Sequence, residues 1–151
     1  MSPQQHRELS LEAWLMPTEP ATLSVIENRC DAIEECYEFM LGYAGKGLPS
    51  DDGSQVRHYL QRAADALRGL AESFSEVVSL RRLEPAAKYE AFMSVLERDS
   101  KDSLAAIELV LAQPTISSQL IDNLNASIHL RALLTDIFLI DGIFRDQMKT
   151  A

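Results

Sequence analysis

The clearest structural signal in the chain lies in residues 23–44, which read LSVIENRCDAIEECYEFMLGYA. Apolar residues recur there at alternating spacings of three and four: Leu23, Ile26, Cys30, Ile33, Tyr37, Met40 and Ala44. This spacing places all seven on one side of an α-helix. Ser24 and Glu27 have the spacing of a capping box, and glycines and a proline follow from residue 42 to residue 49. We therefore expect a helix over residues 24–43.

A second stripe of the same kind follows: Val56, Leu60, Ala63, Leu67, Leu70, Phe74 and Val77. It predicts a helix that begins after the Asp51-Asp-Gly-Ser54 cluster, whose side chains can cap a helix, and that runs to about residue 83. Strand-like alternation of apolar and polar residues is not sustained anywhere. The pattern is that of an all-helical chain.

The third apolar stripe runs between Pro85 and Pro114 and is interrupted by seven polar residues, 97–103. Either the helix breaks there, with a new cap at Asp99 or Ser100, or it continues with Ser100 and Ser103 on its core side. A fourth helix is expected from about Ser117 to residue 148, with an apolar residue ahead of its cap.

These segments predict an all-α fold, an antiparallel four-helix bundle whose third helix is either continuous or split. A short arm, residues 1–20, precedes a single bundle domain, residues 21–151. The arm holds the apolar residues Trp14, Leu15 and Met16 before Pro17 and Pro20. We expect the arm either to pack on its own bundle or to enter a groove of a partner.

The net charge is −9 and the isoelectric point is near 4.7, which disfavours binding to nucleic acid because phosphates would be repelled. Residues 1–53 hold ten acids and three bases, so most of the excess charge lies there. No signal peptide and no membrane-spanning segment is recognisable, and we expect a cytoplasmic protein. Cys30 and Cys36, six residues apart on one helix, cannot reach each other and are expected to be reduced core residues.

One face of the first helix is acidic, with carboxylates at positions i, i+4, i+7 and i+11: Glu27, Asp31, Glu34 and Glu38. Repulsion between such neighbours costs only a few tenths of a kcal/mol per pair, about 0.2–0.5. The face is therefore open to three interpretations: a solvated surface, a docking face for a basic protein, or a row of metal ligands.

No constellation for catalysis, cofactor binding or metal binding is recognisable. A ferritin-like di-iron bundle needs Glu-x-x-His motifs on two helices. Here Gln55 and Ala126 stand three residues before His58 and His129. The three histidines are scattered, and phosphate-binding and nucleophile motifs are missing. We expect no catalytic residues, no cofactor and no metal.

Two arginines interrupt apolar arcs, Arg29 on the first helix and Arg131 on the fourth. We expect each to form an ion pair in the core or to extend its stem along the end of the bundle. Asp136 and Asp141 are candidate partners. The alternative is a polar ligand pocket that these arginines form with Ser100 and Ser103.

In residues 130–144 the apolar residues go nearly all round the fourth helix, more than one bundle face requires. This belt predicts self-association through Leu130, Leu134, Ile137, Phe138 and Phe144. By elimination, the sequence predicts a non-catalytic, acidic interaction, regulatory or assembly protein that self-associates and binds a protein partner; the acidic face of the first helix suits a basic one. The alternative is a ferritin-like bundle that binds metal or a small ligand in its interior.

Overall fold

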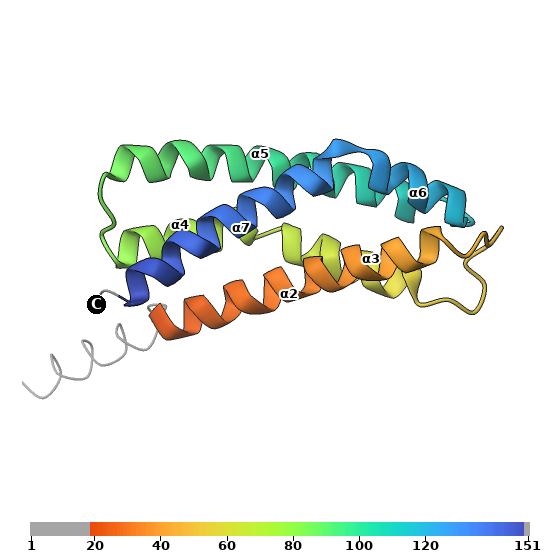
Figure 1. Ribbon diagram of the computed structural model, residues 1–151, viewed down its shortest axis with the longest axis horizontal. Helices are drawn as coiled ribbons and strands as arrows, with labels where there is room; N and C mark the ends of the chain where they lie inside the picture. Colours follow the sequence, from red (N-terminus) through yellow and green to blue (C-terminus); the bar gives the residue numbers. More distant parts are fainter. Residues whose placement is uncertain (1–18, 150–151) are drawn as a thin grey trace, which may run out of the picture.

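The computed structural model describes residues 19–149, and this part of the chain is helical without any strand (Figure 1). The helices are α2 (Glu19–Ala44), α3 (Val56–Leu67), α4 (Leu70–Leu80), α5 (Ala86–Leu111), α6 (Ser118–Ala126) and α7 (Ile128–Lys149). The predicted all-α class is confirmed, whereas the number of helices exceeds the four expected. Among these helices, none has both the length and the apolar character needed to cross a membrane.

The chain runs back and forth along one long axis (Figure 1). After α2, the pair α3 and α4 returns in the opposite direction, α5 runs outward again, and α6 and α7 come back. α2 packs on α3, α4 and α6, while α5 packs on α3, α4 and α7. The start of α2 and the end of α7 lie at the same end of the molecule (Figure 1).

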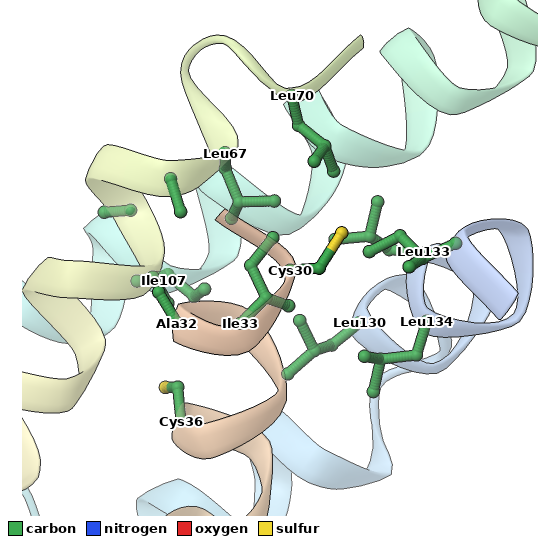
Figure 2. Close-up of a cluster of buried hydrophobic side chains, with 14 of the residues drawn as sticks. Cys30, Ala32, Ile33, Cys36, Leu67, Leu70, Ile107, Leu130, Leu133 and Leu134 are labelled. Atoms are coloured by element: carbon green, nitrogen blue, oxygen red, sulfur yellow. The ribbon is translucent and has the colours of Figure 1, made fainter. Parts of the chain in front are cut away.

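The core forms where the predicted apolar stripes meet (Figure 2). Ile33 of α2 lies among side chains from α3, α4 and α7, with Leu67 and Leu130 close by. All seven residues of the second stripe are buried, as are Ile26, Cys30, Ile33 and Met40 of the first. Burial of a large aliphatic side chain contributes about 1.5–3 kcal/mol. The stripes identified in the sequence therefore contribute many of the side chains that stabilise the core.

The first helix begins at Glu19, five residues before the expected start. Pro20 lies in its first turn, where a proline costs no hydrogen bond. Ser24 and Glu27 are inside the helix, so their predicted capping box does not exist. Glu19 and Pro20, which were expected to belong to the arm, are therefore part of this helix. Its apolar residues 14–16 lie outside the described residues.

The second helix was expected to be continuous, but it breaks between α3 and α4 at Arg68 and Gly69. The guanidinium of Arg29 on α2 lies against this break. Its Nη1 donates to the carbonyl oxygens of Asp65 (3.2 Å) and Ala66 (2.9 Å) at the end of α3. A Cβ at Gly69 would lie 2.8 Å from Arg29 Nη2, so a larger residue there would force the guanidinium to shift. A contact from another helix thus supplies partners for carbonyls that a continuous helix would have satisfied itself.

The third helix, α5, is continuous through the polar segment, so the alternative of a break is wrong. The segment 97–103 contains no glycine or proline, and Lys101 pairs with Glu97 at 3.1 Å on the exposed side. Ser100 and Ser103 are buried on the core side, as the continuous alternative required. Their small side chains let neighbouring helices approach closely without a change in backbone.

The fourth helix starts as predicted, but it breaks after Ala126. Ser117 is the N-cap, and its Oγ accepts from the backbone N–H of Leu120 at 3.0 Å. Ser127 adopts an extended backbone, and its Oγ donates to the carbonyl oxygen of Leu124 at 2.6 Å. This bond satisfies an end carbonyl of α6 and allows α7 to start in a new direction.

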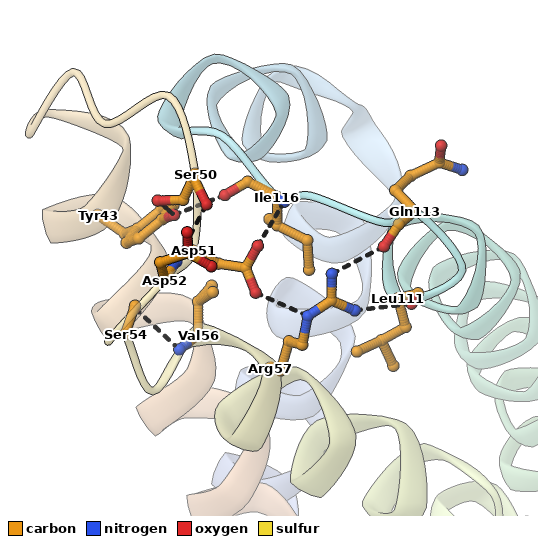
Figure 3. Close-up of polar contacts among 10 residues, drawn as sticks. All are labelled: Tyr43, Ser50, Asp51, Asp52, Ser54, Val56, Arg57, Leu111, Gln113 and Ile116. Atoms are coloured by element: carbon orange, nitrogen blue, oxygen red, sulfur yellow. Dashed lines mark hydrogen bonds and ion pairs between the residues drawn. The ribbon is translucent and has the colours of Figure 1, made fainter.

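A polar network joins the loop after α2 to the loop after α5 (Figure 3). The Asp51 carboxylate accepts from Arg57 Nε at 2.7 Å and from the backbone N–H of Ile116 at 2.7 Å. Arg57 also donates to the carbonyl oxygens of Leu111 (3.0 Å) and Gln113 (2.7 Å). Asp51, expected as a helix cap, instead ties together two loops that are distant in the sequence.

Candidate interaction surfaces

The four carboxylates predicted as an acidic face are all exposed along α2: Glu27, Asp31, Glu34 and Glu38. The structure adds Asp141 of α7, which lies close enough to raise the pKa of Glu34. Partial burial is the largest cause of that raised pKa, followed by the negative charges of Asp31 and Asp141, while Arg145 opposes it. Asp141 of α7, paired with Arg145 at 2.9 Å, therefore lies beside the acidic face of α2, which sequence spacing on one helix could not indicate.

Cys30 lies next to this region, whereas Cys36 lies near Arg62 of α3, and both cysteines are buried and free. Burial raises the pKa of Cys30 to about 12, and the charges of Asp141 and Glu34 add to the effect. Burial likewise raises the pKa of Cys36 to about 12. A thiol with such a pKa is almost wholly protonated at neutral pH, so neither is set up as a nucleophile or a metal ligand.

The residues predicted for self-association do not share one environment. Four of them are buried in the core of the same chain: Leu130, Leu134, Ile137 and Phe144. Only Phe138 faces outward, with 61% of its surface exposed. Leu139 (54% exposed) and Ile143 (37%), which belong to the same predicted belt of residues 130–144, are exposed on α7 as well. An apolar surface on α7 thus exists, and it consists of the part of the predicted belt that the chain itself does not cover.

The two arginines and two serines predicted as a ligand pocket are not brought together. Arg29 lies at the α3–α4 break, bonded to backbone carbonyls rather than to a carboxylate. Arg131 is exposed on α7, so the expectation that it is buried with Asp136 or Asp141 is wrong. Asp141 pairs instead with Arg145, at 2.9 Å. An arginine in an apolar arc stays exposed when no neighbouring helix covers that part of the arc.

Ser100 does line a groove, which lies between α4 and α5 and has a volume of about 880 Å³. Its floor is apolar, with Leu70, Val78 and Met93, and carboxylates such as Glu72 and Glu90 line it too. The Ser100 hydroxyl is buried and has no hydrogen-bond partner. Neither Arg29 nor Arg131 reaches this groove.

A pair of carboxyl groups lies between α5 and α7. Asp136 is half-buried, and its pKa is raised to about 7 by burial, by a hydrogen bond with Asp99 and by the charge of Asp99. Two carboxyl groups in such proximity share a proton more readily than they both ionise. No feature of the sequence indicated this pair, because the two residues lie 37 positions apart and on different helices.

The described histidines do not form a metal centre. His58 makes an edge contact with the ring of Tyr59, and His129 is exposed on α7. Within residues 19–149, no group of three or more histidine, cysteine, aspartate or glutamate side chains is arranged to hold a metal ion. The carboxylates of the acidic face are spread along the helix rather than directed at one point.

Comparisons with known proteins give no relative from which a role could be transferred. No family model, no curated protein and no solved structure matches the chain. The functional argument therefore rests on the surfaces described above.

Proposed function

We propose that this protein is a non-catalytic interaction module that binds a basic protein partner through the acidic face of α2 and associates with itself through α7. The observation that supports the first part is the exposure of four carboxylates along one side of α2, with Asp141 of α7 beside them. Complementary charge steers a partner toward such a face and raises the rate of association.

The bundle arrangement belongs to the same proposal. We infer that the helices form an antiparallel four-membered bundle in which the second member is interrupted between α3 and α4 and the fourth between α6 and α7. The packing of α2 on α3, α4 and α6, and of α5 on α3, α4 and α7, supports this arrangement. Such a scaffold holds the α2 face rigid, so that its charges need no rearrangement on binding.

The test uses reversal of charge on the acidic face. Proteins captured from cells on the parent chain are compared with those captured on a Glu34→Lys, Glu38→Lys variant. For a captured and purified partner, the association rate constant is then measured at low and high salt. The variant should associate at least about tenfold more slowly at low salt, with a weaker salt dependence, because rim charges act mainly on the rate of encounter.

A matched control makes the same change of charge elsewhere. Glu72 and Glu90 are both exposed and line the groove between α4 and α5. A Glu72→Lys, Glu90→Lys variant should associate at nearly the parent rate. An equal rate constant for all three proteins would reject the docking face and leave the carboxylates as ordinary surface charge.

The alternative, a ferritin-like bundle that binds metal or a small ligand in its interior, makes a different prediction. Elemental analysis of the protein purified from cells should then give iron, manganese or zinc at a fixed molar ratio. Such a ratio would contradict the proposed interaction module.

A further inference from the structure

The outer side of α7 carries a stripe with symmetrical spacing. Six exposed residues follow one another along it at intervals of four, three, one, three and four: Arg131, Thr135, Phe138, Leu139, Gly142 and Asp146. We call these six residues the outward stripe. Its centre is apolar, its intermediate positions are small, and its two ends carry opposite charges. Residues at equal distances from the centre of the stripe are therefore similar in kind, except that the two end residues carry charges of opposite sign.

The glycine in this stripe is not required by the fold of the single chain. A Cβ at Gly142 would meet no atom within 4 Å, and its backbone is helical. Glycine within a helix costs about 0.5–1 kcal/mol relative to alanine. A small residue at an exposed helical position does, however, let a second helix approach closely, as in helix pairs that meet at small residues.

We propose that the outward stripe binds a second copy of this chain, with the two α7 helices packed antiparallel about a twofold axis near Phe138 and Leu139. In this register Phe138 of one protomer lies opposite Leu139 of its partner, and Thr135 lies opposite Gly142. An interface with twofold symmetry repeats each contact, so every pairing occurs twice.

Charge complementarity selects a second copy over other occupants of this face. The same antiparallel register places Arg131 of each protomer opposite Asp146 of the other. A parallel arrangement would place like charges together, which disfavours it. An unrelated partner would have no reason to match a stripe whose two halves are complementary to each other.

The contact is expected to be weak and reversible. One helix from each protomer forms most of it, and Ile143 of the same helix is also exposed (37%). Interfaces smaller than about 1,200 Å² are typical of transient association. We therefore expect a dissociation constant between about 1 and 100 µM, as such interfaces commonly give. The average mass in solution should rise from that of a monomer toward that of a dimer as the protein concentration increases through this range.

The experiment is sedimentation analysis of the full chain across that range. Leu139→Glu should keep the protein monomeric. Leu41→Glu is its control, because Leu41 is exposed to a similar degree (52%) but lies on α2. Circular dichroism establishes that each variant is folded, so that loss of the dimer is not loss of structure.

A charge exchange tests the register itself. Arg131→Asp alone should raise the dissociation constant about tenfold, which corresponds to ~1.4 kcal/mol, since two attractive pairs become repulsive. Adding Asp146→Arg should restore the parent value. A parent chain that stays monomeric at 100 µM, or a dimer that Leu139→Glu leaves intact, would overturn the proposal. A dissociation constant that stays raised when Asp146→Arg is added to Arg131→Asp would overturn the antiparallel register.

This inference develops the self-association part of the proposed function and does not involve the basic partner. The two therefore fail separately. Loss of partner binding in the Glu34→Lys, Glu38→Lys variant leaves the sedimentation result unchanged, and a monomeric parent chain leaves the partner experiment unchanged.

Discussion

Replacing Asp51 by alanine should remove the connection between the loop after α2 and the loop after α5. The carboxylate accepts two short hydrogen bonds, from Arg57 and from the backbone of Ile116, and only 13% of its side chain is exposed. The substitution leaves the Ile116 N–H and the Arg57 Nε–H without these acceptors. Arg57 keeps its bonds to the carbonyl oxygens of Leu111 and Gln113, so part of the network survives.

The size of the effect follows from the kind of bond that is lost. Hydrogen bonds to charged groups contribute about 1.5–3 kcal/mol each. The Arg57 side chain is 37% exposed, so water can replace part of what it loses. The expected decrease in the free energy of unfolding is therefore about 2–3 kcal/mol. In a domain of this size, 1 kcal/mol shifts Tm by about 2–4 °C, which gives a decrease of about 5–10 °C.

The assay is denaturant unfolding of the parent chain and of Asp51→Ala as a function of pH. The backbone N–H of Ile116 and the Arg57 guanidinium lower the pKa of Asp51 in the folded state. The unfolded chain then binds more protons than the folded one at low pH, so this stabilisation is complete above the ordinary aspartate pKa of about 3.9. It is lost as pH falls through the lower folded pKa. The difference between the two proteins should be constant near neutral pH and shrink in acid.

The matched control is Asp52→Ala, which removes the same charge from an exposed neighbour. It should change the free energy of unfolding by less than about 0.5 kcal/mol, as ordinary surface substitutions do. Equal destabilisation by the two substitutions would refute the reasoning. So would a difference between parent and Asp51→Ala that persists unchanged into acid while both remain folded.

Three further predictions concern other positions. Gly69→Ala should lower the free energy of unfolding by about 1–2 kcal/mol, because it displaces the Arg29 guanidinium from the carbonyls of α3. In an Arg29→Ala background, the same substitution should cost much less by denaturant unfolding. Gly142→Ala should raise the free energy of unfolding by about 0.5–1 kcal/mol, measured where the chain is monomeric, and an unchanged value would contradict the open space around it. The raised pKa of Asp136, about 7, means that the folded chain holds a proton that the unfolded chain releases between about pH 4 and 7. Stability should therefore fall as pH rises through that interval, and Asp136→Asn should reduce the fall. If Asp136→Asn changes the free energy of unfolding by the same amount at pH 5 and pH 8, the raised pKa of Asp136 is contradicted.

The candidate surfaces were predictable only where they depend on one helix. The four carboxylates of α2 share a face because of helical spacing, so their alignment followed from the sequence. The addition of Asp141 and the carboxyl pair of Asp99 and Asp136 depend on which helices are neighbours. A sequence pattern within one helix contains no information about those distances.

The outward surface of α7 illustrates the same limit. Apolar residues surround this helix, and the sequence indicated that one face exceeded the needs of a simple bundle. Which face remains exposed depends on how many helices pack against α7 and from which directions. Leu130 and Phe144 are covered by the chain itself, whereas Phe138 and Leu139 are not.

The sequence by itself determined the helical class, the buried stripes and the cap at Ser117, because these depend on the 3.6-residue period and on bonds within a few residues. Only the tertiary structure decided where the second helix breaks. The apolar spacing continues without interruption from Leu67 to Leu70, so the periodicity does not end with α3, and Gly69 is the local sign of the break. The break is stable because Arg29, on another helix and 37 residues before Ala66, supplies hydrogen bonds to the freed carbonyls and fills the space above Gly69. A helix end is favourable only where such partners exist, and their position is set when the helices pack.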